Sequence, residues 1–293
     1  MDWQDIEAQI GVATGAAFKV QSAHAVAGGD INAAYRLQGA NKVYFVKLNR
    51  IDLVAMFAAE FAGLEAIAST QTLRVPTPVA YGQGSGHSFL VLEHIGFAKP
   101  TNQSTALMGR LLALMHQQPQ AYFGWHRDNT IGTTLQINTP NTDWQVFWRE
   151  QRLASQLKLA ARNGYGGRLQ RQGERLCCDL PAFFTGYAPQ ASLLHGDLWA
   201  GNAAVDDQGQ PRVFDPACYF GDSEADVAMT ELFGGFGHDF YAAYQAVRPL
   251  PPEYKTRKTL YNLYHILNHL NLFGGAYLRQ AETMMDSLLA ELA

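Results

Sequence analysis

The sequence predicts an α+β fold of two lobes: a small lobe with an antiparallel sheet and one helix, and a larger, mainly helical lobe. Two observations favour this fold. Strand-like and helix-like segments alternate through the first part of the chain, whereas helical periodicity dominates from about residue 104. A continuous apolar strand lies between the two regions. We therefore expect the small lobe at residues 1–95, a connector at about 90–96 and the large lobe at 97–293.

Composition supports a folded protein and excludes several partners. The 293 residues are 47% hydrophobic and 12% aromatic, which is enough for a substantial core. The net charge of -4 gives no reason to expect nucleic acid or an anionic membrane as partner. The N-terminal MDWQDIEAQI is not typical of a secretory signal, and the 3 cysteines lack CxxC spacing. We expect a cytoplasmic protein, a monomer or weak dimer, with no nucleic-acid or membrane partner.

In the small lobe, period-two alternation predicts strands at 31–38 and 42–48, joined by a turn near Gly39–Asn41. Asp52 then stands where the N-cap of a helix is expected. The segment LVAMFAAEFAGLEAIAST that follows carries apolar residues at helical spacing. SFLVLEHIG, which ends at Gly96, is the apolar connector strand.

The larger lobe is predicted from five segments with helical periodicity. These are STALMGRLLALMHQQ, DWQVFWREQRLASQLKLAARNG, a shorter helix near 168–179, SEADVAMTELFGGF and YKTRKTLYNLYHILNHLNLF. One two-stranded element interrupts them, because AAV and RVF are strand-like and DDQGQP between them is typical of a turn.

The stretch LLHGDLWAGNAAV holds His195, Asp197 and Asn202 between apolar residues. Alone it could be a tight turn with local hydrogen bonds. The following hairpin, however, can return Asp215 to the same place, and carboxylate and amide oxygens suit Mg²⁺. We expect His195 to hold the loop and its glycines to make room for substrate and metal.

This order of residues is the one that phosphoryl transfer requires. Protein kinases use H-R-D-x-x-x-x-N followed by D-F-G, in which the first Asp accepts the hydroxyl proton and the Asn and second Asp bind metal. The present chain has H-G-D-x-x-x-x-N and then D-P-A. Either half alone is a weak signal, but together they predict an enzyme that uses ATP and Mg²⁺, with Asp197 as base and Asn202 and Asp215 as metal ligands.

The small lobe supplies the matching nucleotide site. Lys47 lies on the second predicted strand and Glu60 in the next helix, where it can pair with Lys47; Glu65 is a rival partner. Two further elements are assigned to the nucleotide: Gly28 and Gly29 near the phosphates, and the backbone of Glu93 and Ile95 at the adenine.

With these residues identified, the chain resembles the fructosamine (ketosamine) 3-kinases, which are aminoglycoside-phosphotransferase-like enzymes with a protein-kinase-like fold. The resemblance extends over nearly the whole chain, through AGGDINAAYRL, FVKLN, AAEFAGLEAI, FGWHRDNTIGTTLQINT, DWQVFWREQRL, LLHGDLWAGNAAVDDQG, FDPACYFGDSEADVAMTELFGGF and LYHILNHLNLFG. It implies phosphorylation of the third hydroxyl of a ketosamine, free or on a protein lysine, which leads to deglycation. The chain has no recognisable activation loop, which argues against control by phosphorylation.

Four residues are assigned to the substrate side: Trp199, Asp128, Asn129 and His269. Core packing is the alternative for Trp199, and helix capping for the polar loop at 128–130. His265 and His269 are four residues apart, but no Glu follows His265, so the HExxH zinc motif is not met. Two rival functions remain open: a kinase of the aminoglycoside or choline type, and a nucleotide-binding pseudokinase.

Overall fold

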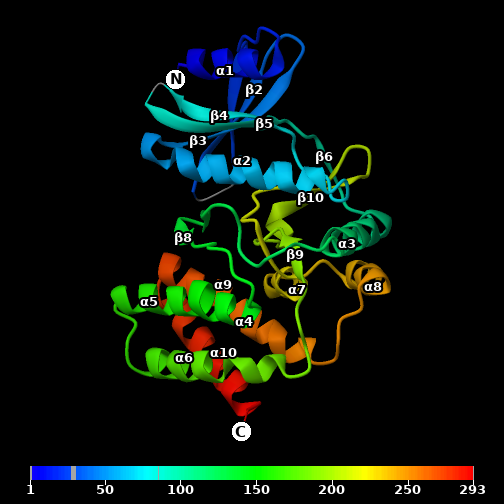
Figure 1. Cartoon of the computed structure of the whole chain (residues 1–293). Coiled ribbons are helices and arrows are strands. Elements are labelled where there is room, and N and C mark those ends of the chain that lie inside the picture. Colours follow the sequence, from blue (N-terminus) through cyan, green and yellow to red (C-terminus); the bar gives the residue numbers. More distant parts are fainter. Residues whose placement is uncertain (1, 28–30, 85, 293) are drawn as a thin grey trace.

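One five-stranded antiparallel sheet forms the small lobe (Figure 1), in the order β1-β2-β3-β5-β4. The computed structural model describes residues 2–27, 31–84 and 86–292. The elements of the small lobe are α1 (Gln4–Thr14), β1 (Ser22–Val26), β2 (Ala33–Gln38), β3 (Val43–Arg50), α2 (Val54–Ser69), β4 (Pro78–Gly84) and β5 (His87–Glu93).

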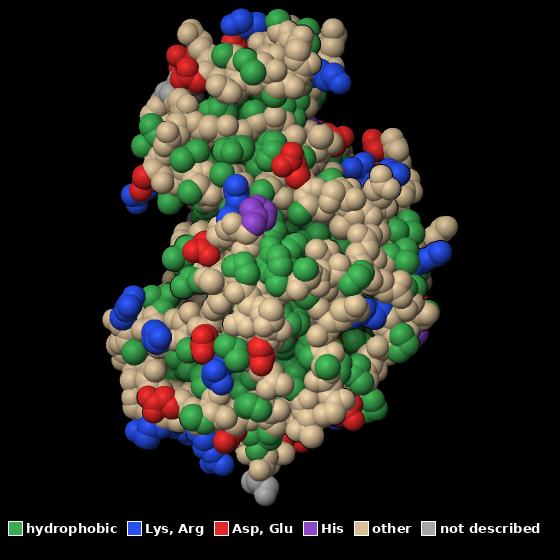
Figure 2. Space-filling view, in the orientation of Figure 1, with side chains coloured by type: hydrophobic (Ala, Val, Ile, Leu, Met, Phe, Trp, Pro, Cys, Tyr) green, Lys and Arg blue, Asp and Glu red, His purple; other side chains and the backbone are tan. Residues whose placement is uncertain are grey.

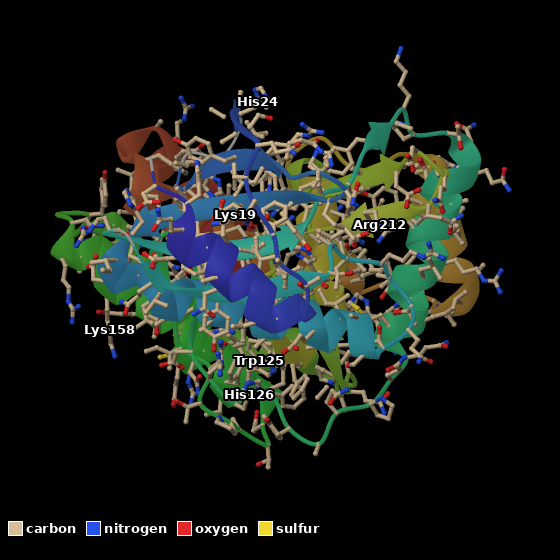
Figure 3. All side chains as sticks on the ribbon, turned by 90° about the horizontal axis from the view of Figure 1, so that it is seen from above. Lys19, His24, Trp125, His126, Lys158 and Arg212 are labelled. Atoms are coloured by element: carbon tan, nitrogen blue, oxygen red, sulfur yellow. The ribbon has the colours of Figure 1, made fainter. Side chains whose placement is uncertain are left out.

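The two faces of this sheet are covered by different helices. Along β5, Phe89 and Val91 pack with Ile6 and Ile10 of α1. Leu90, on the opposite face, joins the core that contains α2. Successive strand residues point to opposite faces, so the apolar stretch FLVL of β5 is buried on both sides. Figure 3 shows α1 lying across the sheet from above, with Lys19 labelled, which pairs with Glu7 of that helix.

Two details of the small lobe differ from the prediction. The lobe contains α1 in addition to the single helix expected, because an amphipathic segment is needed to cover the outer face of the sheet. Asp52 is not an N-cap: a 3-10 turn at Ile51–Leu53 precedes α2, and the carboxylate of Asp52 binds Arg50 at 2.6 Å.

The larger lobe is mainly helical, with three short sheets of the orders β11-β10-β6, β12-β9 and β7-β8. Its helices are α3 (Asn102–His116), α4 (Trp144–Phe147), a π-helix (Trp148–Leu153), α5 (Ala154–Arg162), α6 (Arg168–Asp179), α7 (Ser223–Leu232), α8 (His238–Val247), α9 (Tyr254–Phe273) and α10 (Leu278–Ala290). Its strands are β6 (Phe97–Ala98), β7 (Asn129–Ile131), β8 (Thr134–Gln136), β9 (Ala191–Leu194), β10 (Ala203–Asp206), β11 (Pro211–Val213) and β12 (Tyr219–Asp222).

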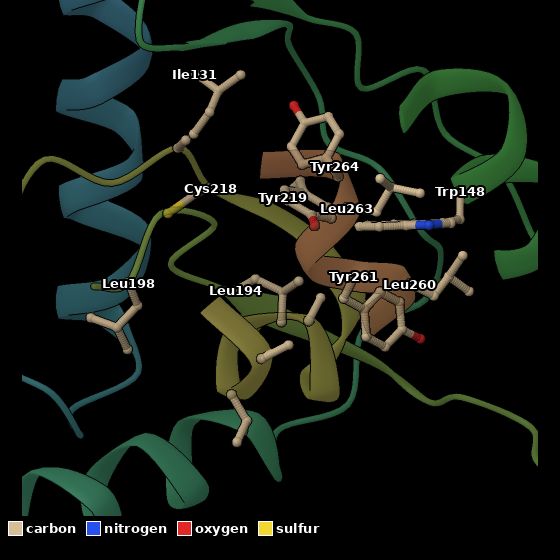
Figure 4. Close-up of a cluster of buried hydrophobic side chains, with 14 of the residues drawn as sticks. Ile131, Trp148, Leu194, Leu198, Cys218, Tyr219, Leu260, Tyr261, Leu263 and Tyr264 are labelled. Atoms are coloured by element: carbon tan, nitrogen blue, oxygen red, sulfur yellow. The ribbon is translucent and has the colours of Figure 1, made fainter. Parts of the chain in front are cut away.

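An aromatic core holds the helices of this lobe together (Figure 4). The ring of Trp148 meets that of Tyr261 edge-on at 4.8 Å and that of Tyr264 at 5.7 Å, so the π-helix packs directly on α9. The π-helix interrupts the single helix predicted over DWQVFWREQRLASQLKLAARNG. The sequence did not predict this interruption, because the periodicity of apolar residues does not reveal one extra residue in a helical turn.

The β10–β11 hairpin forms as predicted, with Ala203 opposite Val213, and it brings Asp215 back beside the start of β10. β6 pairs with β10 and is therefore part of the large-lobe sheet. The division at 1–95 and 97–293 stays a prediction. Within the described residues, no helix is long and apolar enough to cross a membrane.

Candidate active site

A buried carboxylate holds the backbone of the loop at 195–202, which connects β9 to β10. Asp226 of α7 accepts the backbone N–H of His195 at 2.6 Å and of Gly196 at 2.8 Å, and it lies 3.2 Å from Nε2 of His116. Burial by itself would raise the pKa of Asp226, but these hydrogen bonds, that of His116 first, hold it below its usual value. Sequence reasoning missed Asp226, although it is the one acid in the apolar run ADVAM.

His195 holds the same loop through its ring. Its Nδ1 accepts the N–H of Asp197 at 3.3 Å, and its Nε2 lies 3.0 Å from the carbonyl of Phe214. This pattern requires a neutral ring with the proton on Nε2, and burial lowers the pKa of His195 in the same sense. His195 therefore joins the loop to the residue that precedes Asp215.

The glycines of the loop make room for protein atoms, so the expectation that they accommodate substrate and metal is wrong. Gly196 has a φ of +81°, and a Cβ there would lie 2.1 Å from the carbonyl oxygen of Ala217. A Cβ at Gly201 would lie 2.2 Å from the ring of Trp199. The first glycine lets two segments cross, and the second lets the indole lie on the loop.

Lys47 of β3 meets two carboxylates from different elements. Its Nζ lies 2.6 Å from Oε1 of Glu60 on α2 and 2.5 Å from Oδ1 of Asp215. Burial by itself would lower the pKa of Lys47, but Asp215 and Glu60 raise it above its usual value. The lysine is therefore a fixed positive charge between the lobes. The rival partner, Glu65, is exposed on α2.

Asp197 and Asn202 form a second polar pair at the same place. Nδ2 of Asn202 donates to the backbone oxygen of Asp197 at 2.9 Å and to its Oδ2 at 3.1 Å, which leaves Oδ1 of Asn202 for a cation. Burial, and then the charge of Asp215, raises the pKa of Asp197 to about 7. The side chain of Asp215 is 46% exposed, and both Asp215 and Asn202 line the same cavity, so their carboxylate and amide oxygens suit Mg²⁺.

A cavity of about 660 Å³ opens beside these residues, and the molecular surface is hollowed between the two lobes (Figure 2). This volume is typical of a site for a small molecule. Among the described residues that line it, the carboxylates are those of Glu60, Asp197 and Asp215. All three belong to the polar group around Lys47 and Asn202.

The remainder of the cavity is largely aromatic. We define the aromatic wall as Trp199, Phe233, His269, Phe273 and Tyr277, all of which line the cavity. The ring centroids of Phe233 and His269 are 4.9 Å apart, those of His269 and Tyr277 5.2 Å, and those of Trp199 and Phe233 6.2 Å. The wall therefore runs continuously from the 195–202 loop to the end of α9.

Comparison with known proteins identifies the family of the chain. The sequence model described as fructosamine kinase matches residues 2–291. This chain belongs to the fructosamine kinase family. It is 46% identical over 288 residues to a probable ketoamine kinase of Synechocystis, covering 98% of this chain and 97% of the relative. It is 43% identical over 282 residues to the chloroplastic protein-ribulosamine 3-kinase of Arabidopsis thaliana, covering 95% and 86%.

Solved structures agree with the family and confirm the two-lobed protein-kinase-like fold. The crystal structure of a protein assigned as a fructosamine-3-kinase from Haemophilus somnus superposes with a TM-score of 0.90 at 29% identity, covering 98% of this chain and 97% of that one. An aminoglycoside phosphotransferase superposes with a TM-score of 0.63 at 15% identity, over 98% and 99%, and shows the same fold.

In this member of the fructosamine kinase family, the residues predicted on the substrate side do not all reach the cavity. Trp199 and His269 line it. Asn129 lines it too, but its side chain is only 6% exposed and is engaged with protein atoms. Asp128 does not line it: the residue is exposed, and its Oδ1 accepts the N–H of Asn138 at 2.8 Å. The sequence pattern of the polar loop at 128–130 did not show which of its side chains point toward the cavity and which point toward solvent.

The predicted adenine contacts stay a prediction for this fructosamine kinase family member. The backbone N–H of Glu93 donates to Thr77 at 2.9 Å, and the carboxylate of Glu93 binds the hydroxyl of Thr77 at 3.0 Å. The first of these bonds occupies the N–H of Glu93, and neither Glu93 nor Ile95 lines the cavity. Gly28 and Gly29 lie outside the described residues.

Proposed function

We propose that this protein transfers the γ-phosphoryl group of ATP to the third hydroxyl of a ketosamine, the rearranged adduct of a sugar and an amine. One observation carries the proposal: Lys47, Asp197, Asn202 and Asp215 converge on a cavity that is also lined by the aromatic wall. The ketoamine kinase and protein-ribulosamine 3-kinase relatives support the acceptor.

The polar residues divide the tasks of this reaction among them. Asp197 orients the acceptor hydroxyl and accepts its proton at a carboxylate oxygen, while the amide of Asn202 holds the other side of that carboxylate. Lys47 binds phosphate oxygens and is itself held by Glu60. Asp215 and Asn202 would hold Mg²⁺, which neutralises charge on the transferred phosphoryl group when it is bound. The reaction then depends mainly on positioning.

The product accounts for the release of the amine. A phosphate at the third carbon stands next to the ketose carbonyl, so it is prone to elimination. After enolisation the C–O bond at the third carbon breaks and inorganic phosphate leaves; water then hydrolyses the resulting imine, which releases the free amine and a deoxy-dicarbonyl sugar. The enzyme would thereby act in deglycation, on ketosamines of small amines or of protein lysines. A cytoplasmic location and a monomeric or weakly dimeric state remain predictions.

The aromatic wall favours a ketosamine over a polycationic antibiotic. Apolar and aromatic surfaces bind the hydrocarbon parts of a sugar and its amine substituent, whereas several ammonium groups require several carboxylates. The carboxylates of the described cavity residues are already engaged around Lys47 and Asn202. Trp199, 38% exposed, is the member of the wall placed nearest in sequence to Asp197 and is proposed to contact the sugar.

A direct assay tests the proposal. ADP release and mass-spectrometric phosphate transfer would be followed with ATP and Mg²⁺ on ribulosyl-lysine, fructosyl-lysine, kanamycin and choline. We expect turnover with one or both ketosamines and release of free lysine afterwards. Turnover with kanamycin or choline alone would contradict the substrate class. Absence of turnover with all four would contradict the assignment as a kinase of these acceptors and favour the pseudokinase.

A further inference from the structure

A buried hydrogen-bond network lies behind the proposed metal ligand Asp215. Asn129 of β7 donates from Nδ2 to the carbonyl of Cys218 at 2.8 Å. Gln136 of β8 donates from Nε2 to the carbonyl of Ala217 at 3.1 Å and to Oδ1 of Asn129 at 2.8 Å. The β7–β8 hairpin thus binds the two backbone carbonyls that follow Asp215 and Pro216.

The segment that receives these bonds has a strained backbone. Asp215 has a φ of +57°, in the left-handed region that a residue with a Cβ seldom adopts. Such a conformation persists when the surrounding structure over-determines it. On one side Ala217 donates its N–H to the carbonyl of His195 at 2.8 Å. On the other side, Asn129 and Gln136 donate hydrogen bonds to the carbonyls of Cys218 and Ala217.

The hairpin is itself fixed by a buried arginine. Arg152, in the π-helix, donates to Oδ1 of Asn138 at 2.7 Å, and Asn138 donates to Oδ1 of Asn129 at 3.0 Å. Arg152 is fully buried and forms no salt bridge with any carboxylate of the described chain. Its guanidinium lies 4.1 Å from the ring centre of Tyr219 and 4.6 Å from that of Phe147.

Tyr264 of α9 completes the network. Its hydroxyl donates to Oε1 of Gln136 at 2.7 Å, so that the amide of Gln136 must turn its nitrogen toward Ala217. Figure 4 shows Tyr264 with Tyr219 and Cys218 in the same part of the core. One charged group and four amide or hydroxyl groups are therefore buried around this one backbone segment. Apolar side chains would have been enough to fill the core, so the polar groups point to a role in orienting the segment.

We propose that Asn129 and Gln136 are positioning residues for Asp215, with Arg152 and Tyr264 fixing their orientation. The inference rests on the proposed function, because it takes Asp215 to meet the magnesium nucleotide. In protein kinases the segment after the equivalent Asp is ordered by phosphorylation. Here permanent buried hydrogen bonds order it, so the site is assembled without a switch. In this role Asn129 acts through the backbone carbonyl of Cys218.

The test uses Gln136→Met, which keeps the side-chain volume but loses all three hydrogen bonds of the Gln136 side chain, and the milder Tyr264→Phe, which loses one of them. Arg257→Lys is the control for the loss of a buried polar contact elsewhere in the core, since Arg257 is 1% exposed and pairs with Glu224, and neither residue lines the cavity. For each protein, the rise in melting temperature would be titrated with Mg²⁺ at constant AMP-PNP. The Mg²⁺ concentration for half-maximal turnover and the KM for ketosamine would be measured as well.

We expect Gln136→Met to need about tenfold more Mg²⁺ in both titrations, because groups that orient a metal ligand affect metal affinity on this scale. Tyr264→Phe should need about threefold more Mg²⁺. In both variants the KM for ketosamine should change by less than about twofold. The control, Arg257→Lys, should lower the melting temperature without changing the Mg²⁺ requirement. If Gln136→Met does not fold, Tyr264→Phe decides.

Unchanged Mg²⁺ midpoints in the folded variants would overturn the proposal and leave the network a structural one. The proposal would also be overturned if Arg257→Lys shifted the Mg²⁺ midpoint as much as Gln136→Met or Tyr264→Phe does. The AMP-PNP titration does not involve a ketosamine. If the wild-type protein shows no ketosamine turnover, the proposed function fails while the positioning role is still decided by the titration.

Discussion

Nζ of Lys47 lies 2.5 Å from Oδ1 of Asp215, 168 positions later in the chain. This contact joins the sheet of the small lobe to the hairpin end of the large lobe. It also sets the distance between the proposed phosphate anchor and the proposed metal ligand, since Glu60 holds the same ammonium group from the other side. The two lobes therefore meet through groups that are proposed to bind the nucleotide and its metal ion.

Replacing Lys47 by Met should abolish most turnover. We expect kcat to fall by about 100-fold or more, because the fixed charge on the phosphates is lost. Steady-state ADP release on a ketosamine measures this. Lys19→Met is the control: that lysine also pairs with a glutamate, but its side chain is 81% exposed. Equal losses in both variants would contradict a specific role for Lys47.

Asp197→Asn should lower kcat by about 10² to 10⁴-fold, because the amide cannot accept the hydroxyl proton. Nucleotide binding should persist, so the stabilisation by AMP-PNP and Mg²⁺ measured by thermal denaturation should stay within about twofold in apparent affinity. Asp207→Asn, in the exposed hairpin turn, serves as control. A variant at Asp197 with wild-type kcat would show that another group is the base.

Gly196→Ala should destabilise the fold and displace the catalytic loop. The added Cβ meets the carbonyl of Ala217 at 2.1 Å, in addition to the cost of a φ of +81°. Gly209→Ala is the matched control, since Gly209 has a φ of +77° but no atom within 4 Å of the new Cβ. We expect about 1 kcal/mol of lost stability at Gly209 and at least about 3 kcal/mol at Gly196 by urea denaturation. Similar losses of stability in the two variants would show that the segments around Gly196 and Ala217 move apart to accommodate the added methyl group.

Trp199→Ala should raise the KM for ketosamine about tenfold, with a smaller effect for Trp199→Phe, because an aromatic surface against the substrate is lost. The KM for ATP should not change. Trp3→Ala is the control, because Trp3 packs on Tyr35 in the small lobe at a ring distance of 5.2 Å. An unchanged KM for ketosamine would place the substrate elsewhere in the cavity.

Acid should destabilise the protein through His265. Burial, and then His269, lowers the pKa of His265 from 6.5 to about 3. Between these values the unfolded chain binds a proton that the folded chain does not, so stability falls as the pH drops below 6.5. From pH 7 to pH 5 the loss from this residue should be about 2 kcal/mol.

Urea denaturation at the two pH values checks the size of this effect. A His265→Gln variant should lose less stability than the wild type between pH 7 and pH 5, whatever its stability at pH 7. His24→Gln, at an exposed position, should retain the wild-type pH dependence. If the pH dependence of His265→Gln equals that of the wild type, the acid sensitivity belongs to other groups.

Local patterns were sufficient for much of the site. Asp197 and Asn202 are five residues apart on one loop, and a short hairpin necessarily returns Asp215 nearby. Lys47 follows from strand alternation and Glu60 from helical spacing. Such relations depend on backbone geometry over a few residues, and this geometry is the same in any fold.

The sequence patterns were least informative where burial decides the role of a polar side chain. Asp128 and Asn129 are neighbours in one polar loop, yet Asp128 is exposed and Asn129 is buried with its amide on Cys218. Asp52 has the position of a helix cap but binds Arg50 instead. A sequence pattern cannot distinguish these outcomes, because each depends on which distant group is available as a partner.

By itself, the sequence determined the two-lobed α+β fold, the order of the catalytic motifs and the family, because these depend on local spacing and residue type. Only the tertiary structure decided that Asp226 anchors the 195–202 loop, that the glycines admit protein atoms, and that Arg152 is buried without a carboxylate partner among the described residues. The physical reason is that a buried polar group must find its partner wherever packing places one, and packing brings together residues that are far apart in the chain.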